Sequence, residues 1–286
     1  MGIKTRLSLS RAQRLFPDIG ILSLHPTRQG VIDTTFILTA TSCRYILKRY
    51  ERAGQKQIGD EAGLLKRLQA CGLHVPRLLN TSEEWYLFTY LEGETPHPID
   101  LHKLRALGAF LGKMHRCTYK RESSFTPFDK GSFKEDIRKL RLLNPLLAKQ
   151  FEELLNFDDR HDGTIHGDLF PDNTKFDGKR LGIFDFIESG NGSFHFDTGI
   201  TAMSWIGDEK ISKMKLQMFL KAYNQNSPRK LELGELLTQM QYAALAYGLQ
   251  RRLNDEHELD YSQMLKKHAR IKLFKKDILK RALPLK

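Results

Sequence analysis

Three polar side chains in the middle of the chain have the types and the spacing that phosphoryl transfer requires. Residues 166–173 read HGDLFPDN, which places Asp168 shortly before Asn173, and Asp185 follows twelve residues after Asn173. One carboxylate could accept the proton of an attacking hydroxyl, while a second carboxylate and an amide oxygen hold Mg²⁺ on the phosphates. The spacing therefore predicts Asp168 as the base and Asn173 with Asp185 as the metal ligands. The alternative is three polar loop residues that only cap turns.

A hairpin is predicted between Asn173 and Asp185. Two apolar runs, residues 174–176 and 181–186, are separated by an Asp-Gly pair at 177–178. Such a pair favours the type I′ turn that joins neighbouring antiparallel strands. Because a hairpin folds the chain back on itself, we expect the side chains of Asn173 and Asp185 to converge.

A cation for the phosphates is expected in the first part of the chain. The run RYILKRY over residues 44–50 is rich in apolar and aromatic residues, which is typical of a strand, and alternation places Lys48 and Arg49 on opposite faces. A lysine in an apolar strand is costly unless it is paired, and Glu61 on the following helix is the natural partner. Two alternatives stay open: Lys48 on an edge strand that points to solvent, and Arg49 as the cation.

The remaining contacts to a nucleotide are predicted from position rather than from a motif. Residues 28–35 precede the lysine strand and read RQGVIDTT, so Gly30 offers a flexible turn, and Thr34 and Thr35 offer hydroxyls to phosphates. The run WYLFTYL ends in a Glu-Gly pair, and an edge strand there leaves backbone N–H and C=O groups for an adenine. The residues of this connector are Thr89, Tyr90 and Leu91.

The elements that must position these residues form a β-rich first part and a helical second part. Strand-like and helical periodicities alternate in the first part and give way to helices in the second: strands over 30–39, 44–50 and 85–91, then helices over 58–70, 101–117, 133–155 and from 196 onward. We predict an α+β, protein-kinase-like fold of two lobes. The β-rich nucleotide-binding lobe covers residues 1–91, and the mainly helical lobe with the catalytic loop and the acceptor site covers 92–286.

Length and composition are those of an ordinary globular protein. The 286 residues include 40% hydrophobic and 28% charged side chains, and no apolar run approaches the roughly 20 residues of a transmembrane helix. The basic N-terminal run MGIKTRLSLSRAQR lacks the apolar segment of a secretory signal. A cytoplasmic location is the expectation, and the oligomeric state is left open.

The net charge of +12 is concentrated at the two ends of the chain. Residues 1–14 carry four basic side chains and no acid, and residues 265–286 carry nine against Asp277 alone, so residues 15–264 are neutral. A basic body would have favoured a nucleic-acid surface, and a nucleic acid is not expected as a partner. Apolar residues recur at helical spacing in 265–286, so we expect a helix docked on the second lobe. An anionic partner or a membrane surface is the alternative.

These motifs together resemble those of a known family. The HGDLFPDN run, the FDF triplet at 184–186 and the paired Lys48 and Glu61 are similar to the aminoglycoside phosphotransferase and choline kinase superfamily of small-molecule kinases. Within it, the chain resembles type II homoserine kinases, through FDFIESGNGSFHFDTGITAMSW over 184–205 and AALAYGLQRRLND over 243–255. The resemblance covers nearly the whole chain and implies ATP and Mg²⁺ as cofactors.

The resemblance implies that Asp168 is the base and that Asn173 and Asp185 are the Mg²⁺ ligands. It also implies that Lys48, paired with Glu61, holds the ATP phosphates, and it adds supporting residues. Asp197, with His166, would brace the catalytic loop through backbone hydrogen bonds. Arg252 would pair with a substrate carboxylate, for which a surface ion pair is the alternative.

The chain departs from the family pattern in its phosphate loop and at Ser193. Asp33 and Thr34 stand where asparagine and serine are usual, and Ser193 stands where proline is usual. An acid near ATP phosphates is unfavourable unless it points away.

The resulting hypothesis is a kinase that phosphorylates a hydroxyl of a small metabolite, with homoserine as the leading acceptor. Aminoglycosides, choline and sugar alcohols are the alternative acceptors, although the neutral body offers no acidic lobe for a cationic aminoglycoside. Two other classes remain: a nucleotide-binding regulator without catalysis, and a protein that binds nucleic acid through its termini.

Overall fold

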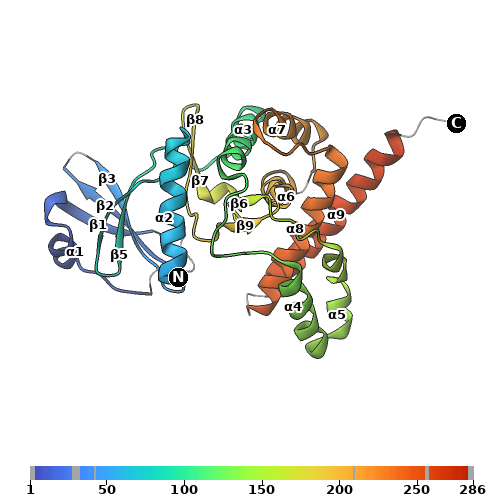
Figure 1. Ribbon diagram of the computed structural model, residues 1–286, viewed down its shortest axis with the longest axis horizontal. Helices are drawn as coiled ribbons and strands as arrows, with labels where there is room; N and C mark the ends of the chain where they lie inside the picture. The colour runs from blue at the N-terminus through green and yellow to red at the C-terminus, as the bar shows by residue number, and fades with distance from the viewer. Residues whose placement is uncertain (1–3, 28–32, 42, 209, 255–257, 283–286) are drawn as a thin grey trace. The chain divides into compact units, whose positions relative to one another are not determined.

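A computed structural model describes residues 4–27, 33–41, 43–208, 210–254 and 258–282 (Figure 1). The chain divides into two compact units, the first formed by Met1–Glu94 and Lys175–Ile187 and the second by Thr95–Thr174 and Glu188–Lys286. The first unit is β-rich and the second is mainly helical, as predicted. The predicted domains have a single boundary after residue 91. They therefore assign Lys175–Ile187 to the second lobe, whereas these residues belong to the first unit.

The first unit is built on a five-stranded antiparallel sheet in the order β1-β2-β3-β5-β4. The strands are β1 (Ile21–Pro26), β2 (Thr34–Ala40), β3 (Arg44–Arg49), β4 (Leu78–Ser82) and β5 (Trp85–Thr89). The predicted runs overlap β2, β3 and β5, whereas β1 and β4 lie outside every predicted run. Both are edge strands with mostly exposed or half-exposed side chains, so they lack the apolar alternation that marks an interior strand.

β3 is the central strand of the sheet, and it carries Lys48. Lys48 lies opposite Thr35 of β2 and Tyr86 of β5 and is only 8% exposed. The alternative of an edge-strand lysine in solvent is therefore excluded. Arg49 instead forms an ion pair with Glu84, with Nη2 and Oε2 2.6 Å apart.

Helices complete the first unit. These are α1 (Leu9–Leu15), a 3₁₀ turn (Pro17–Ile19) and α2 (Gln55–Ala70), which contains the predicted helix over 58–70. α2 buries an apolar stripe together with Glu61. α1 packs Ala12 into a core that contains Leu38, Leu47 and Leu87 of the sheet.

The predicted hairpin is present as β7 (Thr174–Asp177) and β8 (Arg180–Ile183), which pair with each other. Its turn differs from the prediction. Gly178 has a φ of +57°, but Lys179 does not have a positive φ, and a type I′ turn needs both. Glycine with positive φ at the first loop position alone is typical of a type II′ turn, which also matches the twist of a hairpin.

The second unit contains most of the helices. They are α3 (Leu101–Thr118), α4 (Lys130–Leu143), α5 (Pro145–Lys149), α6 (Phe194–Ile206), α7 (Lys213–Asn226), α8 (Leu233–Leu253) and α9 (Glu258–Ala282), with 3₁₀ turns at Glu152–Asn156 and Pro171–Asn173 and the paired strands β6 (Gly163–Ile165) and β9 (Gly190–Gly192). The continuous helix predicted over 133–155 is wrong. The chain breaks at Asn144, because Pro145 cannot donate to the preceding helix and begins a new one.

The basic C-terminal helix α9 packs along α8 (Figure 1). Ile271 is fully buried, and Lys267 Nζ lies 2.9 Å from Asp208 Oδ1. His268 and Lys272 both pair with Glu153. The expected docking of this helix on the second unit is therefore confirmed. Within the described ranges, no helix has the length and apolar character that a bilayer crossing requires.

Candidate active site

The loop between β6 and β7 holds Asp168 in a defined orientation. The Asn173 amide donates from Nδ2 to the Asp168 backbone carbonyl at 2.8 Å and to Asp168 Oδ2 at 3.0 Å. Tyr247 of α8 lies with its hydroxyl 2.9 Å from Asp168 Oδ1. The Asp168 N–H also donates to His166 Nδ1 at 3.2 Å. Both carboxylate oxygens of Asp168 therefore accept a hydrogen bond from within the second unit.

The orientation of Asn173 suits a metal ligand. Because its NH₂ group donates to Asp168, its carbonyl oxygen Oδ1 is the atom left to face a cation. The described residues include no cluster of three or more His, Cys, Asp or Glu side chains that could hold a metal. Mg²⁺ in phosphoryl-transfer sites needs only one or two protein oxygens, since phosphates and water complete its shell. The Asn173 geometry fits such a sparse site.

Asp197 of α6 fixes the backbone that precedes Asp168. It is fully buried and accepts from the His166 N–H at 3.0 Å through Oδ2 and from the Gly167 N–H at 3.0 Å through Oδ1. Burial alone would raise the pKa of Asp197, but the hydrogen bond and charge of His115, together with His166, hold that pKa below its usual value. A buried carboxylate that stays ionised is a rigid anchor for the loop.

His115 is a functional residue that the sequence analysis missed. It lies on α3 and is fully buried, with Nε2 2.9 Å from Asp197 Oδ2 and Nδ1 2.9 Å from the Tyr223 hydroxyl. Since a carboxylate only accepts, Nε2 carries the shared hydrogen. The one signal in the sequence is a histidine inside the apolar stripe of the 101–117 helix.

Gly167 needs to be glycine. Its φ is +80°, and a Cβ there would lie 2.7 Å from the Glu188 carbonyl oxygen. This backbone conformation directs the Gly167 carbonyl oxygen to the Tyr247 hydroxyl, 2.6 Å away. The glycine of the HGD triplet thus sets the geometry of the loop and not only its flexibility.

In the first unit, Lys48 lies between two carboxylates. Its Nζ is 2.8 Å from Asp185 Oδ1 and 3.1 Å from Asp33 Oδ2. Burial disfavours the charged form, yet the charges of Asp185 and Glu61 raise the pKa of Lys48 well above its usual value. Lys48 is therefore a stable buried cation. Asp33, which the sequence marked as a departure from the family, is one of its two direct partners.

Glu61 does not form the direct ion pair with Lys48 that the sequence predicts. Its Oε2 accepts from the Tyr50 hydroxyl and its Oε1 from the Phe186 N–H at 3.1 Å. The carboxylates of Asp33 and Asp185 lie nearer to Lys48 Nζ. Glu61 instead connects α2 to the backbone directly after Asp185.

Asp185 has an uncommon backbone conformation. Its φ is +65°, a left-handed value that costs an aspartate less than most residues but still stores strain. Asp185 lies two residues after the end of β8, and its carboxylate accepts a hydrogen bond from Lys48. Such outliers cluster at functional sites, because the surrounding structure must hold them.

The predicted phosphate loop is only partly described. Gly30 lies outside the described residues. Thr34 is fully buried, where its hydroxyl donates to Glu51 Oε1 at 2.6 Å and accepts from the backbone N–H of Lys4 and Thr5. Thr34 therefore secures the N-terminal segment. Thr35 is directly opposite Lys48 in the register of β2 and β3. Because side chains alternate along a strand, Thr35 and Thr34 lie on opposite faces of the sheet.

The predicted connector divides into two parts. Thr89 is the last residue of β5, and its N–H donates to the Arg77 carbonyl at 2.9 Å while its hydroxyl accepts from the Arg77 N–H. The Thr89 N–H is thus already used. Tyr90 and Leu91 follow the strand, and their backbone groups make no backbone–backbone hydrogen bond within the described ranges.

Two further predicted positions have different surroundings. Arg252 at the end of α8 lies over the Tyr261 ring, with Cζ 5.8 Å from its centroid, and it forms no ion pair with another described residue. Ser193 caps α6, since its hydroxyl accepts from the Phe196 N–H at 3.4 Å. This serine performs at the helix start a capping function that proline cannot.

The site residues therefore form one group in each unit. Lys48, Glu61 and Asp185 belong to the first unit, whereas Asp168, Asn173 and Asp197 belong to the second. The convergence of Asn173 with Asp185 stays a prediction.

Known families and relatives match this chain over most of its length. A model of the phosphotransferase enzyme family known as APH matches residues 23–233. The homoserine kinase of Zymomonas mobilis is 28% identical over 222 residues, which cover 68% of this chain and 69% of that protein. The homoserine kinase of Methylobacterium nodulans is 26% identical over 289 aligned residues, with 88% of this chain and 90% of that protein covered.

A solved structure agrees in fold. An amicoumacin kinase in complex with AMP-PNP and Ca²⁺ superposes with a TM-score of 0.67 at 19% identity, over 97% of this chain and 94% of that one. At this identity the likeness concerns the fold alone. The α+β, protein-kinase-like fold predicted from the sequence is confirmed.

Proposed function

The chain belongs to the phosphotransferase enzyme family, and from this membership we propose that it transfers the γ-phosphoryl group of ATP to a hydroxyl of a small molecule, with L-homoserine as the acceptor. One observation carries the proposal. The carboxylate of Asp168, in an HGDxxxxN loop, is held at both oxygens by Asn173 and Tyr247. A carboxylate oriented in this way is what a general base needs.

Asp168 orients the acceptor hydroxyl and takes its proton. As the acceptor oxygen bonds to the γ-phosphorus, the bond from that phosphorus to the bridging oxygen breaks, and its electron pair leaves with ADP. The acceptor O–H bond breaks in the same process, and the proton passes to Asp168. Positioning and charge stabilisation supply most of the rate in such transfers.

Lys48 binds the phosphates of ATP. A lysine whose pKa is raised stays charged over the whole physiological range, and its position on the central strand β3 keeps Nζ in place. The backbone groups of Tyr90 and Leu91 receive the adenine edge. Thr34 and Thr89 have no part in this proposal, because the Thr34 hydroxyl and the Thr89 N–H are engaged in the first unit.

Asn173 Oδ1 and the Asp185 carboxylate would hold Mg²⁺. A bound Mg²⁺ would supply positive charge to stabilise the phosphates during transfer. Both donors are hard oxygens of the kind that Mg²⁺ prefers. The left-handed backbone at Asp185 and the hydrogen bonds of the Asn173 NH₂ group prepare these two oxygens in advance.

Homoserine is supported as the acceptor by two lines of argument. The two relatives described above are homoserine kinases of similar length, and the neutral body of this chain offers no acidic lobe for cationic aminoglycosides. Choline, an aminoglycoside or a sugar alcohol would need the same base and the same nucleotide contacts. A nucleotide-binding regulator without catalysis would keep the Lys48 group but would not need an oriented Asp168.

A coupled assay of ADP release tests the proposal with homoserine, choline, sugar alcohols and aminoglycosides offered in parallel. Wild-type protein should turn over homoserine best. Asp168→Asn, which keeps the shape of the side chain, should lower kcat by about 10²–10⁴-fold, the usual contribution of a general base. ATP binding should be retained in this variant. Unchanged turnover in Asp168→Asn would refute the mechanism, and turnover of another acceptor alone would refute homoserine.

A further inference from the structure

The N-terminal segment is tied to the start of β2 by the side chain of Thr34, which is fully buried. Its hydroxyl oxygen accepts from the backbone N–H of Lys4 at 3.1 Å and from that of Thr5 at 3.0 Å, and its hydrogen is donated to Glu51 Oε1 at 2.6 Å. The Thr5 hydroxyl donates to the same Glu51 oxygen at 2.8 Å. One buried hydroxyl thus joins the N-terminal segment, the start of β2 and the loop that follows β3.

The loop after β3 also holds Asp33 against Lys48. The Glu51 N–H donates to Asp33 Oδ1 at 3.1 Å, while Asp33 Oδ2 lies 3.1 Å from Lys48 Nζ. The side chains of Lys48 and Asp33 are only 11% and 10% exposed, so solvent screens this ion pair weakly. Asp33 is therefore fixed at one oxygen by Glu51 and at the other by the lysine that is proposed to bind ATP.

We propose that Thr34 is a positioning residue that sets the affinity for ATP, because its hydroxyl keeps Asp33 against Lys48. This inference rests on the proposed function, in which Lys48 binds the phosphates. A phosphate that approaches Lys48 has the same sign of charge as Asp33, so the carboxylate has to turn away or bear the repulsion. Each contact that holds Asp33 in place adds to the cost of phosphate binding.

Thr34 fixes Asp33 through the backbone and through Glu51. Asp33 directly precedes Thr34, so an anchored Thr34 limits the movement of the Asp33 backbone, and both residues bind Glu51. Burial raises the pKa of Glu51, but the hydrogen bonds from Thr34 and Thr5 outweigh it and leave that pKa below its usual value. Glu51 is therefore an ionised acceptor at neutral pH, and hydrogen bonds to an ionised acceptor are stronger than neutral ones.

The position of Thr34 excludes a direct contact of its hydroxyl with the nucleotide. A hydroxyl has one hydrogen and two lone pairs, and Glu51, Lys4 and Thr5 use all three. Its effect on ATP must therefore pass through a neighbour. Asp33 is the neighbour that carries charge and contacts Lys48.

Thr34→Val tests the inference, because it removes the hydroxyl, keeps the β-branched shape and leaves the net charge unchanged. Steady-state kinetics should show the KM for ATP lowered by about two- to tenfold, since the cost of moving Asp33 falls by up to the net contribution of one hydrogen bond. kcat should stay within about twofold, because Asp168 and its contacts are untouched. An unchanged or raised KM for ATP would overturn the inference.

A double-mutant cycle with Asp33→Asn separates this role from a general loosening of β2. If Thr34 acts through the Asp33 carboxylate, Thr34→Val should change the KM for ATP by less than about 1.5-fold once that carboxylate has been replaced by an amide. Independent sites have additive effects. The same change in KM in both backgrounds would therefore overturn the inference.

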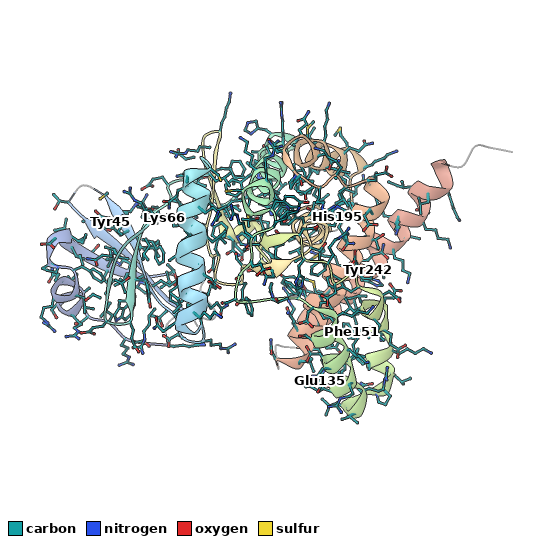
Figure 2. All side chains as sticks on the ribbon, viewed as in Figure 1. Tyr45, Lys66, Glu135, Phe151, His195 and Tyr242 are labelled. Atoms are coloured by element: carbon teal, nitrogen blue, oxygen red, sulfur yellow. The ribbon has the colours of Figure 1, made fainter. Side chains whose placement is uncertain are left out.

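Thr39→Val is the matched control at the other end of β2, on the opposite face of the sheet from Thr34. Thr39 lies opposite Arg44 of β3, and the next residue of β3 is Tyr45 (Figure 2). This variant should leave the KM for ATP unchanged. A decrease equal to that of Thr34→Val would overturn the inference.

Thr5→Val is a second variant, at a half-buried position of the N-terminal segment. It removes the hydrogen bonds of the Thr5 hydroxyl with Glu51 and Arg49 and keeps the Thr34 hydroxyl. We expect the KM for ATP to fall by about twofold, at the lower end of the range for one hydrogen bond. If Thr34→Val does not fold, an unchanged KM in Thr5→Val would overturn the inference.

Calorimetric titration with a non-hydrolysable ATP analogue measures the same effect without an acceptor. The dissociation constant should fall in Thr34→Val and stay unchanged in Thr39→Val. Binding by the wild type with an unchanged dissociation constant in Thr34→Val would overturn the inference and leave the proposed function intact. No binding of the analogue by the wild type, or full turnover in Asp168→Asn, would instead overturn the proposed function.

Discussion

At the scale of residues, Lys48 is shared between carboxylates with opposite consequences for ATP. Asp185 is a proposed metal ligand, so Mg²⁺ would neutralise it when ATP binds. Asp33 is not a proposed metal ligand, and its Oδ2 lies 3.1 Å from Lys48 Nζ. Unit charges about 6 Å apart repel by about 3 kcal/mol at an effective dielectric constant of about 20. Asp33 should therefore weaken the binding of phosphates at Lys48.

Asp33→Asn is expected to lower the KM for ATP by roughly tenfold, because the repulsion is removed and part of it was already screened by solvent. The substitution keeps the side-chain oxygen that accepts from the Glu51 N–H at 3.1 Å, so the strand should remain in place. Titration with ATP checks this directly. Glu84→Gln is the control, since it removes an acid that pairs with Arg49 and should leave the KM unchanged. A higher KM in Asp33→Asn would mean that Asp33 supports ATP binding.

The sequence predicts functional residues that lie together in one short motif. It misses functional residues that come from distant parts of the chain. Asp168 and Asn173 are recognisable because one short loop carries both. Tyr247 of α8 contacts the same loop, and His115 of α3 contacts Asp197, which binds the backbone of the loop. Nothing local distinguishes them from other aromatic or basic residues of an amphipathic helix, because their function depends on packing between helices.

At the scale of elements, the close approach of α3 and α7 depends on small residues. A Cβ at Gly108 would lie 2.3 Å from the Phe219 carbonyl oxygen and 3.1 Å from the Tyr223 nitrogen. Because both are backbone atoms of α7, the helices would have to separate. This packing has a functional consequence, since α3 carries His115 and α7 carries Tyr223, which meet beside Asp197.

Gly108→Ala should destabilise the protein by about 1–3 kcal/mol, the usual cost of overpacking. Urea denaturation measures this change in the free energy of unfolding. Gly63→Ala is the matched helical control, because a Cβ at this exposed position of α2 meets no atom within 4 Å. That variant should gain about 0.4–1 kcal/mol. Equal effects of both substitutions would contradict the assigned contact between α3 and α7.

The elements found from the sequence are those with one clear periodicity. β2 alternates between buried and half-exposed positions, and α2 repeats its apolar residues at helical spacing. β4 is mostly exposed, so its short apolar start does not separate it from a loop. The prediction of one helix over 133–155 failed for a different reason: the apolar period continues across Pro145, but the hydrogen-bond ladder does not.

At the scale of the whole molecule, the net charge of +12 is a property of chain ends around a neutral body. α9 carries much of it, and the helix has two different faces. Its Ile271 is buried, and Gly248 of α8 would place a Cβ only 3.2 Å from Met264 Cβ. Lys266, Lys276 and Lys280 are exposed on α9. Stability should depend on the first face and net charge on the second.

Two variants separate these faces. Ile271→Ala should lower the free energy of unfolding by about 2–5 kcal/mol, because it leaves a cavity in the contact between α8 and α9. The triple replacement of Lys266, Lys276 and Lys280 by glutamate should change it little, since exposed side chains usually contribute within about 0.5 kcal/mol each. Kinase activity should stay at the wild-type level in the triple variant. Thermal unfolding and a salt-dependent duplex DNA titration, performed on both variants and the wild type, check these outcomes. Specific DNA binding by the wild type that persists at physiological salt and disappears in the triple variant would contradict a purely structural role for the basic helix.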